Sequence, residues 1–284
     1  PISHLMDVLA DAREIMAELG IHFESSASEA AAGAMLAASV NYPLRGAVTW
    51  KSTVGTNVAS DALANVASGG VKGGALVIVG EDYGEGSSIM QERTHAFAMK
   101  SQMWLLDPRP SLPAIVNMVE KAFELSEASN TPVILELRVR ACHLYGRFEA
   151  KDNVRPAFQL KDAMDNPERD VNRIVLPPAN YLHEHEKINK RWPAAVEFIT
   201  KERLNEFLGG ALGEEDLGGL READDARDVQ RARAHAALVA AAVHLRVEAH
   251  ARLAADVERA DALGAVHLVR RDRDEVRLSL VDVE

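Results

Sequence analysis

Cysteine is almost missing from this sequence, since Cys142 is the single one among 284 residues. One cysteine excludes an internal disulfide, a zinc site built from cysteines and an iron–sulfur cluster held by this chain alone. No run of about 18 apolar residues occurs, which argues against a membrane span. Basic residues are not in excess either: the formal net charge is −11, which disfavours nucleic acid or an anionic membrane surface as a partner. The start of the chain has no basic-then-apolar signal pattern, so we expect a cytoplasmic protein.

What is present is the composition of a folded globular chain, with 47% hydrophobic and 26% charged residues. Residues 1–150 alternate between helical and strand patterns, joined by short loops with glycine and proline. Residues 75–79 are a continuous apolar run bounded by glycines, typical of a strand buried on both faces. This alternation predicts a three-layer α/β/α fold with a mainly parallel sheet, of the kind that covers both sheet faces with helices.

The individual elements follow from hydrophobic spacing and from capping residues. Helices are expected at 3–19 (with Ser3 as N-cap and Gly20 as the end), from Glu24 to about 40, and at 57–67, 88–101 and 110–129. Strands are expected at 21–23, 46–50, 75–79, 103–106 and 132–137.

The rest of the chain has a different character. Residues 151–207 are charged and interrupted by prolines, then helical from about Ala179, which predicts an extended connector that wraps the sheet domain. Residues 208–284 use only eight residue types apart from Gln230 and Ser279. Such a restricted composition has two interpretations. It is either a helical or disordered Ala/Arg-rich tail, or the result of out-of-frame translation of a GC-rich gene. We assign no function to the tail, and the DNA read in the shifted frame distinguishes the two.

Two glycine-containing loops invite a ligand-binding interpretation. The loop at 69–74 precedes the strand at 75–79, whereas a phosphate-cradling loop follows a strand and opens a helix, so a structural turn is the better interpretation. The loop at 80–88 does follow a buried strand, in the position where open α/β sheets bind ligands. A surface loop in which Ser87 or Ser88 caps the next helix explains the same pattern.

Two further groups of reactive side chains have simpler explanations. His183 and His185 are two residues apart, so on a helix they point to different faces, unlike the four-apart pair of a zinc protease. Cys142 has Arg140 and His143 nearby, which is a setting that lowers a thiol pKa, but a lone cysteine after a strand is more often a packing residue.

The stretch from Phe23 to Gly33 is the most informative part of the chain. A carboxylate, Glu24, stands at an expected strand-to-helix junction and is followed by small residues, which give a narrow helix surface that allows close approach. A glutamate held against such a surface is poorly solvated, so its pKa rises, as proton-transfer carboxylates require. The alternative is a helix-start glutamate that is stabilised by the helix dipole.

An ordered series of residues carries a resemblance to a known family. It runs from Glu24 and Gly33 through the 51–59 segment and the glycine loop to the acidic loop with Gly84, Ser87 and Ser88, and continues through the 122–127 helix and the 132–135 strand. The 51–59 segment contributes Lys51, Gly55, Asn57 and Ala59. The series, over roughly residues 1–207, resembles the N-terminal pyrimidine-binding domain of thiamine-diphosphate-dependent 2-oxoacid:ferredoxin oxidoreductases, in particular the indolepyruvate type. The chain start resembles the end of that family's first strand and loop, so we expect the chain to be a fragment.

The resemblance implies a role for Glu24 and for the neighbouring loops. The residue that matches Glu24 hydrogen-bonds N1′ of the cofactor's aminopyrimidine, which activates the C2 carbon for attack on a 2-oxoacid. Decarboxylation, electron transfer through iron–sulfur clusters to ferredoxin and acyl transfer to coenzyme A follow. Lys51, Gly55, Asn57, Gly84, Ser87 and Ser88 are expected to line the cofactor cleft. Glu29 is the other candidate for the carboxylate role. It lies five residues after Glu24, so on a helix its side chain would project about 140° away from that of Glu24.

The departures from the family are equally specific. The chain lacks a Gly-Asp-Gly/Ser-type diphosphate loop with its Mg²⁺ ligands, and it lacks a Cys-x-x-Cys-x-x-Cys cluster motif. Mg²⁺ and iron–sulfur clusters are therefore expected on missing parts or on a partner subunit. The expected partners are a diphosphate-binding domain, a second copy or a beta subunit, and ferredoxin. Two alternatives stay open: another thiamine-diphosphate enzyme, such as a pyruvate or 2-oxoglutarate oxidoreductase or a decarboxylase, and a non-catalytic assembly or regulatory module.

Overall fold

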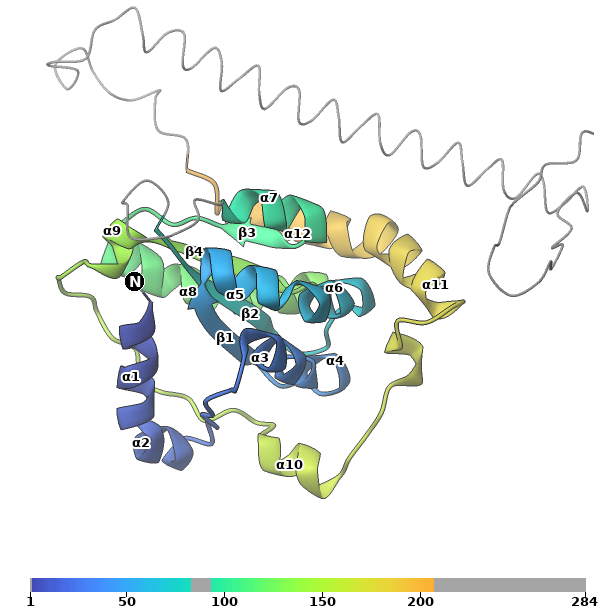
Figure 1. The fold of residues 1–284 in the computed structure, drawn as a ribbon, viewed down its shortest axis with the longest axis horizontal. Helices are drawn as coiled ribbons and strands as arrows, with labels where there is room; N and C mark the ends of the chain where they lie inside the picture. The colour runs from blue at the N-terminus through green and yellow to red at the C-terminus, as the bar shows by residue number, and fades with distance from the viewer. Residues whose placement is uncertain (1, 83–92, 207–284) are drawn as a thin grey trace, which may run out of the picture. The chain divides into compact units, whose positions relative to one another are not determined.

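Four parallel strands form the centre of the computed structural model, which describes residues 2–82 and 93–206. Their order in the sheet is β1-β2-β4-β3, so the chain places β3 at an edge and then returns to insert β4 (Figure 1). The strands are β1 (Gly46–Lys51), β2 (Ala75–Glu81), β3 (Trp104–Leu106) and β4 (Val133–Arg138). In the register, Val77 of β2 faces Val48 on one side and Ile134 on the other.

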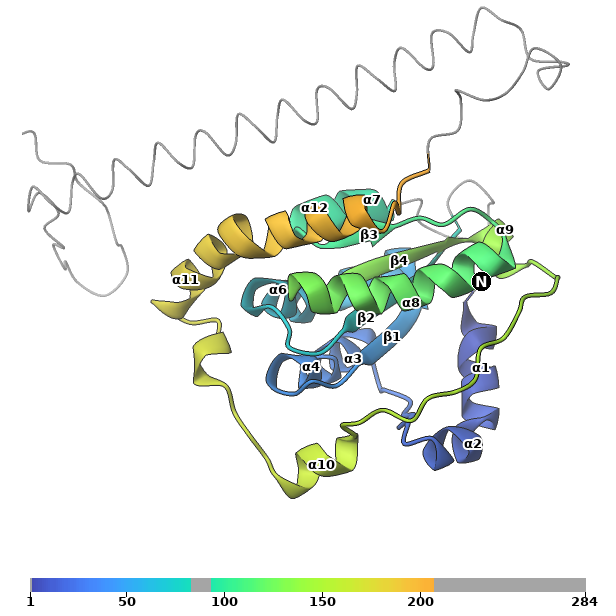
Figure 2. The same cartoon turned by 180° about the vertical axis from the view of Figure 1, so that it is seen from behind.

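Helices cover both faces of this sheet, which confirms the expected three-layer fold. One face carries α3 (Glu29–Met35), α5 (Ser52–Val58), α6 (Ser60–Gly69) and α7 (Thr94–Ser101). Figure 2 shows the other face, which carries α8 (Leu112–Ser129) with α12 (Trp192–Lys201) beside it. Alternate strand residues fill the two cores: Val77 and Ile134 pack toward Leu63 of α6, whereas Leu76 and Leu135 pack toward Leu125 of α8.

The N-terminal part differs from the expectation in three ways. The first helix is broken at Ala12 into α1 (Ser3–Asp11) and α2 (Arg13–Glu18), although it ends at Gly20 as predicted. The strand expected at 21–23 is wrong, because these residues pair with none of the four strands. The helix expected from Glu24 begins at Glu29 instead. The cause is Ser28, which is extended and accepts the N–H of Ala31 at 3.2 Å as an N-cap.

Other helix boundaries also shift. The helix expected at 57–67 is two helices, of which α5 already begins at Ser52, and α8 starts at Leu112. The helix expected at 88–101 is described only as α7, and residues 83–92 lie outside the described part. A short helix, α4 (Ala38–Asn41), leads into β1.

The connector is extended at first and then becomes part of the helical layers. After β4 and α9 (Val139–Cys142) come α10 (Leu160–Asp165), η1 (Val171–Arg173), α11 (Ala179–Glu186) and a π-helical turn, η2 (Lys187–Arg191), which runs into α12. Ala195 of α12 is fully buried in the core on the α8 side. The helical start predicted near Ala179 is confirmed. Among the described residues, no helix is long and apolar enough to cross a membrane.

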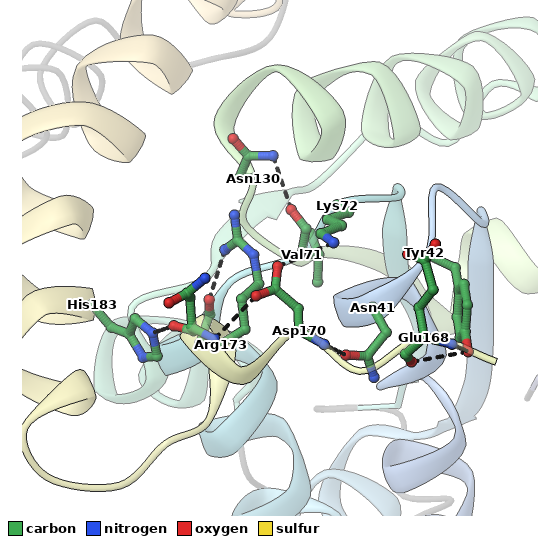
Figure 3. A network of polar contacts seen from close by, with 11 residues as sticks. Asn41, Tyr42, Val71, Lys72, Asn130, Glu168, Asp170, Arg173 and His183 are labelled. Atoms are coloured by element: carbon green, nitrogen blue, oxygen red, sulfur yellow. Dashed lines mark hydrogen bonds and ion pairs between the residues drawn. The ribbon is translucent and has the colours of Figure 1, made fainter.

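Hydrogen bonds fasten the connector to the amino edge of the sheet, as Figure 3 shows. Nζ of Lys72 lies 3.1 Å from Asp170, whose backbone N–H donates to Asn41. The hydroxyl of Tyr42 donates to the carbonyl of Glu168 at 3.0 Å. The glycine loop at 69–74 lies at this edge, before β2. It therefore acts as a structural turn that the connector covers, as the sequence indicated.

Candidate active site at the carboxyl edge of the sheet

Charged side chains gather where the parallel strands end. Nζ of Lys51, the last residue of β1, lies 2.9 Å from Oδ2 of Asp82, the residue after β2. The Asp82 side chain is only 2% exposed and that of Lys51 is 31% exposed. Open α/β sheets bind their ligands outside this edge. The structure thus brings the predicted site residue Lys51 together with an acid of the 80–88 loop.

A small cavity of about 20 Å³ lies at the amino ends of α5 and α7. Ser52 and Thr94 line it, and within the described part of the chain the hydroxyl oxygen of each is buried without a hydrogen-bond partner. Buried polar atoms are nearly always hydrogen-bonded in a finished site. The two hydroxyls therefore indicate a place where a ligand or another domain completes the bonding.

Of the two predicted site residues in α5, Asn57 lies at this cavity and Gly55 lies in the core. Asn57 is exposed and lines the cavity. Gly55 is buried against Trp50, and a Cβ at this position would overlap the indole ring. Trp50 in turn donates from Nε1 to the hydroxyl of Thr56 at 3.1 Å. Gly55 therefore serves the close packing of α5 on β1 in this structure.

The two candidate carboxylates occupy different surroundings. Glu24 lies in the loop before α3, its side chain is 55% exposed, and its Oε2 lies 3.2 Å from Nε2 of His22. The prediction that the carboxylate of Glu24 is poorly solvated is therefore wrong within the described residues. Glu29 is the first residue of α3 and is half-buried. Since Gly33 packs α3 against Ala62 of α6, the narrow helix surface predicted to follow Glu24 follows Glu29 instead.

Three of the predicted residues, Gly84, Ser87 and Ser88, lie outside the described residues. Their contact with the cofactor stays a prediction, as do the contacts expected for Lys51, Gly55, Asn57 and Glu24.

A buried acidic cluster, which no sequence motif indicated, lies at the same edge. Glu136 in β4 is 1% exposed, and Glu81 at the end of β2 is 4% exposed. Around them lie His95 of α7, Arg138 of β4 and Asp107, which follows β3. The signal in the sequence was a single acid, Glu136, within the otherwise apolar strand predicted at 132–137.

The structure does not support a reactive thiol at Cys142 or a metal site at His183. Burial raises the pKa of the Cys142 thiol, so the neutral form is favoured, and its Sγ contacts the carbonyl of Leu137 at 3.5 Å. His183 is buried, and its Nε2 contacts the carbonyl oxygen of Asn172 in η1. Both side chains therefore make structural contacts with backbone carbonyl groups.

The geometry alone does not identify relatives of this chain, but similarity to curated proteins does. No protein-family model matches the chain. A protein from Methanothermobacter marburgensis named indolepyruvate oxidoreductase subunit IorA is 34% identical over 219 residues, which is 77% of this chain and 34% of that protein. Four further relatives carry the same name. This chain is thus similar to IorA subunits over about three quarters of its length.

The IorA relatives are considerably longer than this chain. The relative from Pyrococcus abyssi is 32% identical over 193 residues, which is 65% of this chain and 28% of that protein. The one from Thermococcus kodakarensis is 29% identical over 216 residues, or 32% of its length. The chain thus spans about a third of the length of the IorA subunits that it matches.

Proposed function

We propose that this chain is the pyrimidine-binding part of a thiamine-diphosphate-dependent oxidoreductase of the indolepyruvate type. The observation that carries the proposal is the similarity to IorA subunits over 77% of the chain. A parallel sheet whose carboxyl edge holds charged side chains and a polar cavity supports it, because such edges bind ligands.

The residues at this edge fit one side of a cofactor site. Ser52 and Thr94 offer hydroxyl groups that lack partners within the described chain, and Asn57 and Arg93 line the same cavity. A cavity of about 20 Å³ has room for a group the size of a water molecule but not for a ring. The described residues therefore supply one wall of the site, and a diphosphate-binding domain would supply the other.

Thiamine diphosphate, when bound, supplies a carbon nucleophile for the carbonyl group of a 2-oxoacid and an acceptor for the electrons left by the departing CO₂. This chain's task is to hold the aminopyrimidine ring and to hydrogen-bond its N1′ through a carboxyl group. We assign that role to Glu29, because it is half-buried at the start of the tightly packed α3. Glu24, the residue that the family resemblance implies, is the alternative.

The complete enzyme would oxidise an aryl 2-oxoacid to its acyl-CoA and pass the electrons to ferredoxin. With Cys142 as its single cysteine, this chain cannot hold the iron–sulfur clusters. The clusters and the Mg²⁺ that binds the diphosphate would therefore lie on the remainder of the subunit or on a partner such as a beta subunit. Pairing with a second copy is the other arrangement that completes the site.

The test uses a complete subunit with Glu29→Gln, Glu24→Gln or, as an exposed control on α2, Glu18→Gln. Indolepyruvate-dependent reduction of ferredoxin is measured. Glu29→Gln is expected to slow turnover by about 100- to 10,000-fold, the usual contribution of an acid–base group, while the other two variants stay within about twofold of the unmodified enzyme.

The other outcomes each select a different account. A loss confined to Glu24→Gln would return the carboxylate role to Glu24. Turnover with pyruvate or 2-oxoglutarate but not indolepyruvate would favour another thiamine-diphosphate enzyme. Full activity in every variant would contradict the catalytic proposal and favour a non-catalytic module.

A further inference from the structure

One histidine and two carboxyl groups converge near the carboxyl ends of β3 and β4. His95 belongs to α7, Asp107 follows β3, and Glu136 lies in β4. Each of the three side chains offers one ligand atom, and these atoms lie within 4.8 Å of one another. An imidazole nitrogen together with two carboxylate oxygens is a set of donor atoms that divalent transition-metal ions such as Zn²⁺ bind.

The side chain of Glu136 points to a ligand independently of this clustering. It is 0% exposed, and among the described residues neither of its carboxyl oxygens has a hydrogen-bond partner. A buried carboxyl group without such partners is costly whether or not it carries a charge. Buried polar atoms in folded proteins are nearly always paired. A metal ion bound at Glu136 would provide the partner.

The distance between His95 and Glu136 fits two ligands of one ion better than a direct hydrogen bond. Nδ1 of His95 lies 3.5 Å from Oε2 of Glu136. A charged hydrogen bond between these groups would be about 2.7–2.9 Å long. Zinc bonds of about 2.0–2.2 Å in a tetrahedral arrangement place neighbouring ligand atoms about 3.4 Å apart. The separation in the structure is therefore close to that of two zinc ligands.

Arg138 contacts both carboxyl groups without taking the oxygen that lies next to His95. Its Nε lies 3.4 Å from Oε1 of Glu136, whereas Oε2 is the oxygen on the His95 side. Its guanidinium also donates to both oxygens of Asp107, at 2.7 and 3.3 Å. Each carboxylate oxygen has a second lone pair that an ion can use. Arg138 thus orients two ligands, as outer hydrogen-bond partners do in metal sites.

The local charge favours a divalent cation in spite of the positive charge of Arg138. Glu81 is 4% exposed and is the residue of β2 that pairs with Arg138, so a third carboxyl group lies in the same neighbourhood. With the carboxyl groups ionised, as metal binding requires, three negative charges oppose one positive charge. The excess of two negative charges matches one divalent ion, and attraction to three carboxylates exceeds repulsion by one guanidinium.

We propose that His95, Asp107 and Glu136 bind one divalent transition-metal ion such as Zn²⁺. The ion joins α7 to the end of β3 and to β4, and water completes its coordination. The side chains of His95 and Asp107 are 48% and 33% exposed, so the ion reaches the buried carboxyl group from solvent. Mg²⁺ binds more weakly, because hard cations prefer oxygen ligands throughout.

The experiment titrates the full chain with Zn²⁺ at a constant pH of about 7.5, because protons compete with metal ions for imidazole and carboxyl ligands. Binding is followed by the imidazole NMR signals of His95, which separate this site from the other histidines. We expect Glu136→Gln and Asp107→Asn each to weaken Zn²⁺ binding at His95 by at least about tenfold, since even the loss of an outer partner costs that much.

Asp7→Asn is the matched control. The Asp7 carboxylate lies 3.9 Å from Nδ1 of His4, but both side chains are exposed. We expect this variant to stay within about twofold of the unmodified chain, because an exposed pair contributes little.

Three results would overturn the proposal. The first is that Zn²⁺ leaves the His95 signals unchanged, which is what a simple ion pair between His95 and Glu136 predicts. The second is unaltered affinity in Glu136→Gln and Asp107→Asn, and the third is an equal response to Mg²⁺. Should Glu136→Gln fail to fold, Asp107→Asn decides, because its side chain is partly exposed. Since no thiamine diphosphate is present, these outcomes are independent of the proposed function.

Discussion

At the scale of single residues, burial determines how much an ion pair contributes to the stability of the folded chain. The Lys51–Asp82 pair joins the ends of β1 and β2 at 2.9 Å, with a carboxylate that is 2% exposed. The Lys161–Asp165 pair on α10 is 3.8 Å long, and its side chains are 84% and 62% exposed. Water screens the second pair on both sides, whereas in the first pair it reaches Lys51 but hardly the carboxylate of Asp82.

Lys51→Met is therefore expected to destabilise the chain, because it removes the cation beside a buried carboxylate. Loss of one partner of a fully buried pair costs about 3–5 kcal/mol, and we expect about 2 kcal/mol here because Lys51 is partly exposed. Lys161→Met is the matched control, with an expected change below about 0.5 kcal/mol. Urea unfolding measures both, and equal effects would contradict the distinction.

Glu136 predicts a pH dependence of stability. Its folded pKa lies above its unfolded value, so the folded state keeps a proton that the unfolded state loses. The unfolded state therefore binds fewer protons, and stability falls as pH rises from about 4.5 toward about 9. One such proton gives a slope of up to about 1.4 kcal/mol per pH unit.

Glu136→Gln is expected to remove that slope. Relative to the unmodified chain, the variant gains stability at pH 8 compared with pH 5, as measured by urea unfolding at both values. A difference between the two proteins that does not vary with pH would contradict the raised pKa of Glu136.

At the scale of elements, the end of α6 depends on the connector. The guanidinium of Arg191, in η2, is 2% exposed and donates to the carbonyls of Ala67 and Ser68 at 2.8 and 3.1 Å. Its Nε donates to the hydroxyl of Thr131 after α8. Arg173 donates to the carbonyl of Gly69. Two cations thus satisfy the carbonyls that a helix end leaves unpaired.

Arg191→Met is expected to cost about 3 kcal/mol or more, because it leaves buried carbonyls without donors. Burial lowers the pKa of Arg191 to about 10, so the side chain is still charged at pH 7. Arg173→Met, which removes one bond at a half-buried position, is the control with an expected cost of about 1 kcal/mol. Chemical unfolding compares them, and a smaller effect at Arg191 would contradict this account of α6.

The sequence predicted the strands better than the site. Strands β1, β2 and β4 lie within two residues of their predicted bounds. For β2 the reason is that a strand buried on both faces leaves a continuous apolar run. The start of α3 was misplaced, since periodicity does not reveal which of several serines forms the cap. The carboxylate role that the family resemblance implies for Glu24 stays a prediction. The buried acids Glu81 and Glu136 meet only through the pairing of β2 with β4, which no local pattern encodes.

At the scale of the whole molecule, the two edges of the sheet differ in what covers them. The connector closes the amino edge with the hydrogen bonds of Figure 3. The carboxyl edge instead holds two cavities, and the hydroxyl groups of Ser52 and Thr94 in the smaller one lack partners within the described residues. This asymmetry agrees with a ligand site completed by a further domain. The tail at 208–284 lies outside the described residues, so its frameshift interpretation stays a prediction for the gene sequence.

Exchange of the C2 hydrogen of bound thiamine diphosphate with deuterium oxide tests the central claim most directly. NMR measures the exchange in a complete subunit, before any substrate is added, so that only the carboxyl group and the cofactor are involved. The account predicts that Glu29→Gln slows this exchange by about 100- to 10,000-fold while the fold is retained. Exchange at the unmodified rate in both Glu29→Gln and Glu24→Gln would contradict it.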